Sequence, residues 1–463
     1  MSVPGYNDTI AAVATAAGNA AIGIIRISGP AAFLIARKIF QATTFSADPP
    51  IPRHLYCGRI VDPSDRALLD EVLLACMPAP HSYTGDDVVE INCHGGLTGI
   101  GAVLELVLAN GARAAGPGEF TRRAFINGRL DLAQAEAVID LIESQTSAAL
   151  KIAARQMRGA LSERVSAVRN SLIELRAHLE ACIDFPEDGI DIIPRERAGD
   201  ALLDQCMHIR ALIENARQSA CYRSGLDTVI AGKPNVGKSS IMNVLLGDDR
   251  SIVTAIPGTT RDVIRETISI AGVPVRLHDT AGIHTSTNEI ETIGMDRALD
   301  HFANADITLL VFDGSRPLDM HDMLLLEKKQ PLSCIAVINK SDLQQHSDMR
   351  MLMDFFDHDM IVPVSAASRK GFEALRDRLA RLVRADCAPA VGDVIITSLR
   401  HTQALAGALG ALERAYEAAH AALPFELVSA DVQEALHSLG EITGETASAD
   451  ILDAIFSRFC IGK

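Results

Sequence analysis

The 463-residue chain lacks several features that would place it in specialised classes of protein. No apolar run approaches the roughly 20 residues that a membrane span requires. The small apolar stretch at the N-terminus has no basic segment before it, so we expect no signal peptide. The nine cysteines include no CxxC pair, which argues against a zinc ribbon, and an odd count in a chain of this size predicts no disulfide framework. We therefore expect a reduced, cytoplasmic protein.

Basic charge is also scarce, because 43 Lys and Arg residues stand against 59 Asp and Glu residues, for a net charge of −16. A protein this acidic is not a general polyanion binder, so contact with RNA would need a local basic patch or a partner's surface. Hydrophobic residues make up 48% and charged residues 22%, which excludes a disordered chain. At about 150 residues per domain, the length predicts about three domains.

The first part of the chain, residues 1–120, has the pattern of an α+β domain. Short runs rich in Ile, Val and Leu, bounded by Gly, Pro and Asp, are typical of strands. They lie at 22–28, 69–77 and 87–93, and helix-like segments lie at 30–40 and 97–111. We expect this N-terminal part to fold as a compact domain.

Residues 121–220 change in character, because no proline occurs between Pro117 and Pro186 and apolar residues recur at three- and four-residue steps. This periodicity predicts long amphipathic helices, and a similar pattern returns in residues 386–463. In the intervening residues 221–385, strands alternate with helices, which is typical of a parallel sheet with loops at its carboxyl edge. The expected strands there are 228–232, 275–279, 307–313 and 334–339. One helical domain with an inserted α/β domain is the economical interpretation, and two separate helical domains are the alternative.

The segment from Gly232 to Ser239, GKPNVGKS, fits the phosphate-binding pattern G-x-x-x-x-G-K-[ST]. It follows a predicted strand and precedes a predicted helix, as such a loop requires. The glycines let backbone N–H groups point at a phosphate chain, the Lys238 ammonium reaches the β- and γ-phosphates, and the Ser239 hydroxyl binds Mg²⁺. The contacts that this loop predicts for a nucleotide include Asn235, Val236, Gly237, Lys238, Ser239 and Ser240.

Three further motifs follow predicted strands in the order expected of a guanine-nucleotide site. In the first, the Asp279 carboxylate can hold Mg²⁺ through water, and a glycine amide can contact the γ-phosphate. In the second, the Asp342 carboxylate can accept hydrogen bonds from the N1–H and 2-amino groups of guanine, a donor pair that adenine lacks. In the third, a backbone amide can support the guanine O6. The residues involved are Asp279, Thr280, Ala281, Gly282, Asn339, Lys340, Asp342, Ser365 and Ala366.

A switch segment is expected between the first two of the four motifs, where Thr260 would close over the γ-phosphate and share Mg²⁺ with Ser239. Residue 283 is Ile, whereas Ras-like GTPases place a water-orienting glutamine there. An aliphatic side chain cannot orient water, so hydrolysis needs another group, and Glu289 and Glu291 are acidic candidates downstream. No arginine finger is evident in the sequence.

Four segments outside these motifs carry a more specific pattern: IIRISG at 24–29, SYTGDDVVEINCHGG at 82–96, PGEFTRRAFINGRLDLAQAEAVIDLI at 117–142 and EITGETASADILDAIFSRFCIGK at 441–463. With the inserted GTPase domain, they make nearly the whole chain resemble the family of tRNA modification GTPases called MnmE or TrmE. The resemblance implies a multidomain α/β and all-α fold. Its parts are an N-terminal α+β folate-binding domain, a discontinuous helical domain and an inserted Ras-like P-loop GTPase domain with a mostly parallel sheet.

The resemblance implies a potassium-activated GTPase, in which K⁺ stands where an arginine finger would act. A monovalent cation that bridges phosphate oxygens neutralises charge that grows in the transition state. The matching ligands are the Asn235 side chain, the backbone of Thr254 and Ile256, and the position of Thr259. The implied water-orienting residue is Glu291. The implied nucleotide-contacting loop comprises Thr254, Ala255, Ile256, Pro257, Gly258, Thr259 and Thr260.

The resemblance also implies that the N-terminal domain binds 5,10-methylenetetrahydrofolate or 5-formyltetrahydrofolate and forms a homodimer. The matching contact residues are Arg26, Glu90, Arg129 and the C-terminal Lys463. A carboxylate such as Glu90 suits the amino edge of a pterin, and cations suit the glutamate tail. Cys460 matches a functionally important cysteine of the family, and both a thiolate role and simple packing are open.

The function that the resemblance implies is modification of C5 of the wobble uridine of certain tRNAs, by addition of an aminomethyl-type group. A one-carbon tetrahydrofolate and an FAD-dependent partner called MnmG or GidA would take part, and the partner would carry most of the tRNA contact. A ribosome-assembly GTPase of the Era-like class is an alternative, but it predicts a basic KH-like C-terminal domain, whereas this chain ends in an acidic helical tail. A scaffold that dimerises on GTP is a second alternative, and it has no need of a folate site.

Overall fold

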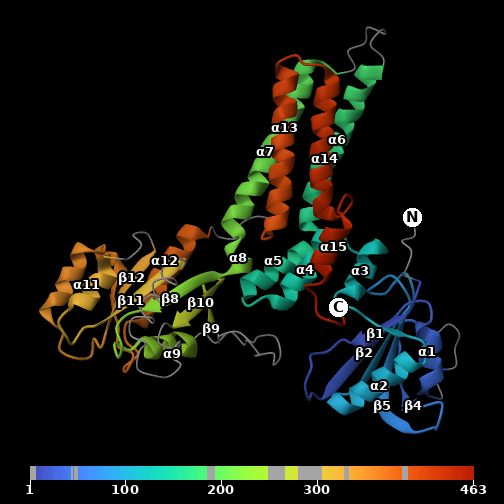
Figure 1. Ribbon diagram of the computed structural model, residues 1–463, viewed down its shortest axis with the longest axis horizontal. Coiled ribbons are helices and arrows are strands. Elements are labelled where there is room, and N and C mark those ends of the chain that lie inside the picture. Colours follow the sequence, from blue (N-terminus) through green and yellow to red (C-terminus); the bar gives the residue numbers. More distant parts are fainter. Residues whose placement is uncertain are drawn as a thin grey trace.

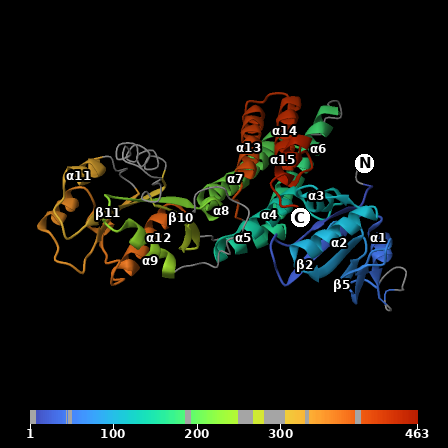
Figure 2. The ribbon, with the colours of Figure 1, turned by 60° about the horizontal axis from the view of Figure 1, so that its bottom comes forward.

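The computed structural model describes residues 7–42, 45, 51–184, 193–248, 266–279, 305–327, 333–387 and 395–463. A bundle of long helices stands in the middle of the molecule, with an N-terminal α+β domain at one end and an α/β domain at the other (Figures 1 and 2). The predicted fold class is therefore confirmed. Among the described helices, none is long and apolar enough to cross a membrane.

The N-terminal domain is a seven-stranded sheet in the order β3-β4-β5-β6-β2-β1-β7, antiparallel except for the β1–β7 pair. Helices α1 and α2 pack on the sheet, and their apolar residues share one core with the strands. The three strands expected in this domain are confirmed as β2, β5 and β6. The bounds are β1 Ile10–Val13, β2 Ile22–Ser28, α1 Ala32–Ile39, β3 Phe40–Gln41, β4 Leu55–Val61, β5 Leu68–Met77, β6 Val88–His94, α2 Leu97–Ala109 and β7 Arg113–Ala114.

Side chains that alternate with the buried ones point to the other face of this sheet. This open face carries Leu55, Leu73 and Ile22, which are 56%, 43% and 60% exposed. It also carries Arg26 and Glu90, which lie opposite each other in the register of β2 and β6. The open face therefore carries exposed apolar side chains as well as an ion pair.

The helical domain is built from segments on both sides of the inserted domain, and its four longest helices lie side by side (Figure 1). Leu172 and Leu202 from the first segment share one buried core with Leu412 and Val432 from the second. The alternative of two separate helical domains is therefore wrong. The bounds are α3 Glu119–Ile126, α4 Leu132–Glu143, α5 Ser147–Met157, α6 Ala160–Asp184, α7 Arg195–Ser219, α13 Leu399–His420, α14 Phe425–Thr443 and α15 Ala449–Phe456.

The inserted domain holds a six-stranded sheet in the order β13-β12-β11-β8-β10-β9, parallel except for the β9–β10 pair. The four strands expected in this domain are confirmed as β8, β10, β11 and β12, and the fourth motif, at Ser365 and Ala366, follows β13. The bounds are α8 Cys221–Ser224, β8 Leu226–Ala231, α9 Lys238–Asp248, β9 Glu266–Ile270, β10 Val273–Asp279, β11 Ile307–Asp313, α11 Met320–Glu327, β12 Cys334–Asn339, η2 Ser347–Asp354, η3 His358–Met360, β13 Ile361–Pro363 and α12 Phe372–Asp386.

The two ends of the inserted domain meet at a pair of cysteines. Cys221 and Cys387 lie side by side there, with Cα atoms 6.2 Å apart although 166 residues separate them in sequence. The other seven cysteines are free thiols. Counting cysteines could not show this pair, because only the return of the chain to its starting edge brings the two together.

Candidate functional site

The phosphate-binding loop connects β8 to α9 at the carboxyl edge of the parallel sheet. Asn235 has a φ of 63°, and Gly237 has a φ of 100°, so the loop turns through two residues in the left-handed region. A Cβ atom on Gly237 would lie 2.2 Å from Asn339 Nδ2, so only glycine fits there. Lys238 is 7% exposed, and its Nζ donates to the carbonyls of Gly232 and Lys233 at 2.9 Å each.

The side chain of Asn339 ties this loop to the region expected to read the base. Its Nδ2 donates to Val236 O at 2.8 Å, and its Oδ1 accepts from Ala366 N at 3.1 Å. Asn339 is 3% exposed, so both bonds are shielded from water. One buried amide therefore holds three of the predicted motif segments together.

The next residue, Lys340, has a φ of 63°, and its Nζ lies 2.5 Å from Asp313 Oδ2 at the end of β11. This ion pair fixes the loop after β12 against the neighbouring strand. Hydrogen bonds from the Ser365 hydroxyl and from its own backbone amide lower the pKa of Asp342. The arrangement thus presents an ionised carboxylate at an exposed position, which can accept the donor pair of a guanine.

Asp279 ends β10, and its backbone lies beside Ile230 in the parallel register with β8. The segment that begins at Asp279, for which a Mg²⁺ role is predicted, therefore starts next to the phosphate-binding loop. The remaining expected residues of the switch and of the potassium and hydrolysis machinery lie outside the described residues. They are Thr254, Ala255, Ile256, Pro257, Gly258, Thr259, Thr260, Thr280, Ala281, Gly282, Ile283, Glu289 and Glu291.

A second cluster lies on the open face of the N-terminal sheet and contains three of the four expected folate contacts. Arg26 Nε donates to Glu90 Oε1 at 2.8 Å, and Arg26 Nη1 donates to Gly462 O at 3.2 Å. The guanidinium also stacks against the rings of Tyr83 and Phe120, with its Cζ 5.3 and 5.7 Å from their centroids. These contacts hold the Arg26–Glu90 pair in one orientation.

The C-terminal tail folds back onto the N-terminal domain, so the last residues lie beside β1 (Figure 1). Phe120 N donates to Lys463 O at 3.1 Å, and a Cβ atom on Gly462 would lie 2.3 Å from Val13 O. Glycine at 462, with a φ of 96°, is therefore required for this approach. Burial, together with the nearby Arg26 charge, lowers the pKa of Lys463. Cys460 is exposed at the edge of the same tail.

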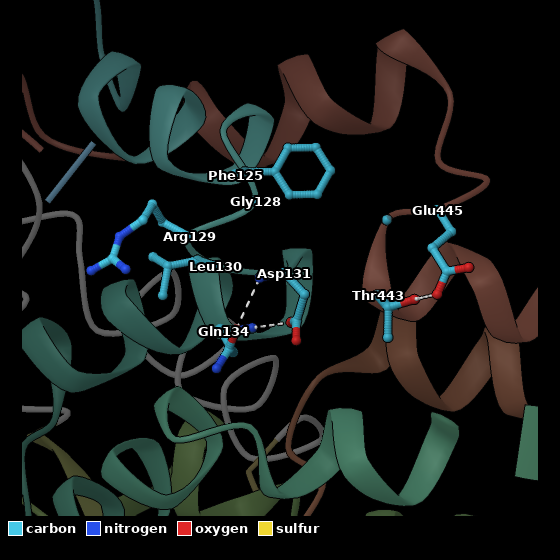
Figure 3. A pocket seen from close by; sticks show the side chains of 9 residues that line it. Phe125, Gly128, Arg129, Leu130, Asp131, Gln134, Thr443 and Glu445 are labelled. Atoms are coloured by element: carbon cyan, nitrogen blue, oxygen red, sulfur yellow. Dashed lines mark hydrogen bonds between the residues drawn. The ribbon is translucent and has the colours of Figure 1, made fainter. Parts of the chain in front are cut away.

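Arg129 lies against the 82–85 segment, where its Nε donates to Ser82 O at 3.2 Å. It lines a cavity of about 400 Å³ that opens between α3, α4 and the turn after α14 (Figure 3). Asp131 and Gln134 in this cavity form a reciprocal cap at the start of α4. Glu445 accepts from Thr443 and pairs with Arg169. Most polar groups of the cavity are therefore engaged within the protein.

Sequence reasoning missed several residues that support these two sites. Tyr83 and Phe120 flank Arg26, Asp313 holds Lys340, and Lys233 pairs with two aspartates at the start of α11. None of these contacts belongs to a local motif, because each joins segments that are distant in sequence. Lys233 lies within the phosphate-binding pattern at one of its unspecified positions, and Tyr83 and Phe120 lie within the segments at 82–96 and 117–142 without a role assigned to them.

The fold and the site define a guanine-nucleotide-binding P-loop domain inserted into a helical domain. The sequence profile described as the MnmE helical domain matches residues 132–460, and the profile described as the GTP-binding protein TrmE N-terminus matches residues 9–129. The chain belongs to the MnmE family of tRNA modification GTPases.

Full-length relatives agree with this assignment. A protein named tRNA modification GTPase MnmE from Alkaliphilus oremlandii (strain OhILAs) is 43% identical over 462 residues and is covered to 99%, as is this chain. A protein of the same name from Clostridioides difficile (strain 630) is 42% identical over 458 residues, with 99% of each chain covered.

Two similar solved structures each match part of the chain. A variant of Era from Aquifex aeolicus bound to GDP and aluminium fluoride is 27% identical, with a TM-score of 0.27, and the match covers 40% of this chain and 66% of that one. The FeoB G-domain from Methanococcus jannaschii is 21% identical, with a TM-score of 0.25, and the match covers 34% of this chain and 98% of that one. At TM-scores below 0.5, neither likeness carries an argument about this chain.

Proposed function

We propose that this chain is a potassium-activated GTPase that modifies C5 of the wobble uridine of certain tRNAs, together with an FAD-dependent partner and a one-carbon tetrahydrofolate. The observation that carries the proposal is that one chain of this family holds two separate sites. One is the guanine-nucleotide edge of the inserted sheet, and the other is the Arg26–Glu90 cluster with the C-terminal tail. A scaffold that only dimerises on GTP would need the first site and not the second.

At the nucleotide site, Asp342 would read the guanine and Lys238 would neutralise the β- and γ-phosphates. Ser239 and Thr260 would hold Mg²⁺, with Asp279 acting through water. An amide oxygen and backbone carbonyls are suitable ligands for K⁺, so Asn235, Thr254, Ile256 and Thr259 would hold it. A K⁺ ion there would neutralise phosphate charge that grows in the transition state.

Water activation is assigned to Glu291, because Ile283 offers no polar atom. A carboxylate can orient the attacking water directly or through a second water. The G domains of two protomers would associate with GTP bound and separate after hydrolysis. That cycle would be coupled to the modification chemistry.

At the second site, Glu90 would face the amino edge of the pterin while Arg26 holds its carboxylate in place at 2.8 Å. Burial, and secondly the nearby Arg26 charge, lower the pKa of Lys463. The Lys463 and Arg26 side chains would face an anionic glutamate tail in this partly buried space. Arg129 would contribute from its position against the 82–85 segment. The Cys460 thiol lies on the same tail, and it would act as a thiolate or pack against the ligand.

The open face of the N-terminal sheet supports the proposed homodimer. Exposed Leu55, Leu73 and Ile22 lie on the same face of the sheet as Arg26 and Glu90. Burying such a surface against a second copy is favourable, at about 25 cal/mol for each Å² of apolar area. Dimerisation would therefore also enclose the folate site.

We place this activity in the cytoplasm, with the flavoprotein MnmG or GidA as partner and with tRNA bound largely through that partner. The net charge of −16 suits this division, because it disfavours extensive phosphate contact by this chain. An Era-like ribosome-assembly switch remains the rival function.

Isothermal titration calorimetry with 5-formyltetrahydrofolate separates the rivals. Wild-type protein should bind the folate, and Glu90→Gln should bind it much more weakly. The carboxylate of Glu90 is an anion with two acceptor oxygens for the two donors of the pterin edge, whereas a glutamine amide is neutral and has only one acceptor oxygen. Glu105→Gln, on helix α2, is the matched control and should bind normally. Absence of folate binding to wild-type protein would favour the assembly switch or the scaffold.

A further inference from the structure

Three charged residues beside the nucleotide site form a compact ion-pair cluster that no motif predicts. Lys233 belongs to the phosphate-binding loop, and Asp319 and Asp322 lie at the start of helix α11. The Nζ of Lys233 lies 2.8 Å from Asp319 Oδ2 and 2.6 Å from Asp322 Oδ2. The Asp322 side chain is only 4% exposed, and that of Lys233 is 25% exposed. The cluster is thus partly buried, where an ion pair is less screened than at the surface.

The two aspartates are held together by the backbone of α11. Asp322 N donates to Asp319 Oδ1 at 3.2 Å, and Asp319 N donates to Asp322 Oδ2 at 3.1 Å. This reciprocal cap brings two carboxylates close together at one helix end, and like charges at that distance repel. Hydrogen bonding to Lys233 is the main cause that lowers the pKa of Asp319. Lys233 is therefore the cation that lies between the two carboxylates and offsets their repulsion.

The same lysine occupies a critical point of the phosphate-binding loop. The carbonyls of Gly232 and Lys233 accept the two hydrogen bonds that hold Lys238 Nζ. Two residues after Lys233, Asn235 takes up the left-handed conformation that turns the loop. Strand β8, which precedes the loop, pairs with β11, and β11 leads into the segment that ends at Asp319. The cluster therefore closes a ring that runs through the loop, β8, β11 and the start of α11.

We propose that Lys233, Asp319 and Asp322 are positioning residues for GTP binding, which hold the phosphate-binding loop in the conformation that receives the nucleotide. This inference rests on the proposed GTPase activity and adds residues that touch the loop rather than the nucleotide. Without these ion pairs the loop samples other conformations, and GTP binding must then restore the conformation that receives the nucleotide. The free energy needed to reorder the loop lowers the affinity for GTP.

The test compares GTP dissociation constants, measured with a fluorescent GTP analogue, with melting temperatures of the full-length protein. Lys233→Met should raise the dissociation constant on the order of tenfold, as expected for a lost coupling between contacting residues. It should also lower the melting temperature, because it leaves the buried Asp322 carboxylate without its cation. Lys233→Arg keeps the charge and should restore both. Lys151→Met, on the exposed face of α5, is the control and should change neither.

The double variant Lys233→Met with Asp322→Asn separates positioning from mere stabilisation. The second substitution removes the Asp322 charge that Lys233→Met leaves without a cation, so the melting temperature should recover. The dissociation constant for GTP should stay raised. Recovery of both would show that the cluster only stabilises α11, and unchanged GTP affinity in both variants would also overturn the proposal. Because binding is measured directly, a wild-type protein that fails to hydrolyse GTP would overturn the proposed function, and the variants' affinities would still decide this inference.

Discussion

Replacing Asn339 by alanine tests whether one buried amide assembles the nucleotide site. The side chain bridges Val236 O and Ala366 N at 2.8 and 3.1 Å, and it is 3% exposed. The variant leaves a buried carbonyl and a buried N–H without partners, and each such loss costs about 1–3 kcal/mol. The total of about 2–6 kcal/mol would be divided between folding stability and nucleotide binding.

If about 2–4 kcal/mol of this appears in binding, affinity for GTP should fall roughly 30- to 700-fold, since 1.4 kcal/mol corresponds to a factor of ten. Titration with a fluorescent GTP analogue measures the affinity, and thermal unfolding measures the part of the cost that falls on folding stability. Asn170→Ala, at an exposed position on α6, is the control and should leave both unchanged. An Asn339→Ala protein that folds and binds GTP with wild-type affinity would refute the bridging role.

Three further predictions concern the chemistry of the nucleotide site. GTPase activity should require K⁺ and be nearly absent in Na⁺, and Asn235→Ala should abolish the difference while GTP still binds; equal steady-state rates of phosphate release in the two salts would contradict this. Asp342→Asn should weaken GTP binding and favour xanthosine triphosphate in competition titrations, because the new amide donates to the C2 oxygen of xanthine; undiminished GTP affinity would show that another group reads the base. Glu291→Ala should lower kcat on the order of 10²–10⁴ with little change in GTP affinity, whereas Glu289→Ala should be nearly silent. Normal single-turnover hydrolysis by the Glu291 variant would rule out its assigned role.

Much of the fold is predictable from the sequence because its signals are local. The run 22–28 and the runs at 307–313 and 334–339 are rich in Ile, Val and Leu and end at turn or motif residues, and they form β2, β11 and β12 with the expected bounds. The proline-free stretch after Pro117 predicts the long helices. The phosphate-binding loop is equally predictable from the sequence, because its glycines and lysine are needed at fixed spacing wherever a backbone wraps a phosphate.

The sequence also determined that Arg26 and Glu90 are candidates for one site, although only by resemblance. Their actual contact depends on the pairing of β2 with β6, which sets the two residues opposite each other 64 positions apart. The arrival of Gly462 at the same arginine depends on how the last helices pack against the N-terminal domain. Such pairings are decided by which faces bury apolar surface together, and no single segment contains that information.

Tertiary structure alone decided the features that join distant segments. Cys221 and Cys387 lie together because helix α12, which follows the last strand, carries the chain back to helix α8 at the start of the inserted domain. The contact of Lys233 with Asp319 and Asp322 exists because β8 and β11 are neighbours in that sheet. In sequence these residues are ordinary charges and thiols, and their roles arise from a strand order that long-range packing selects.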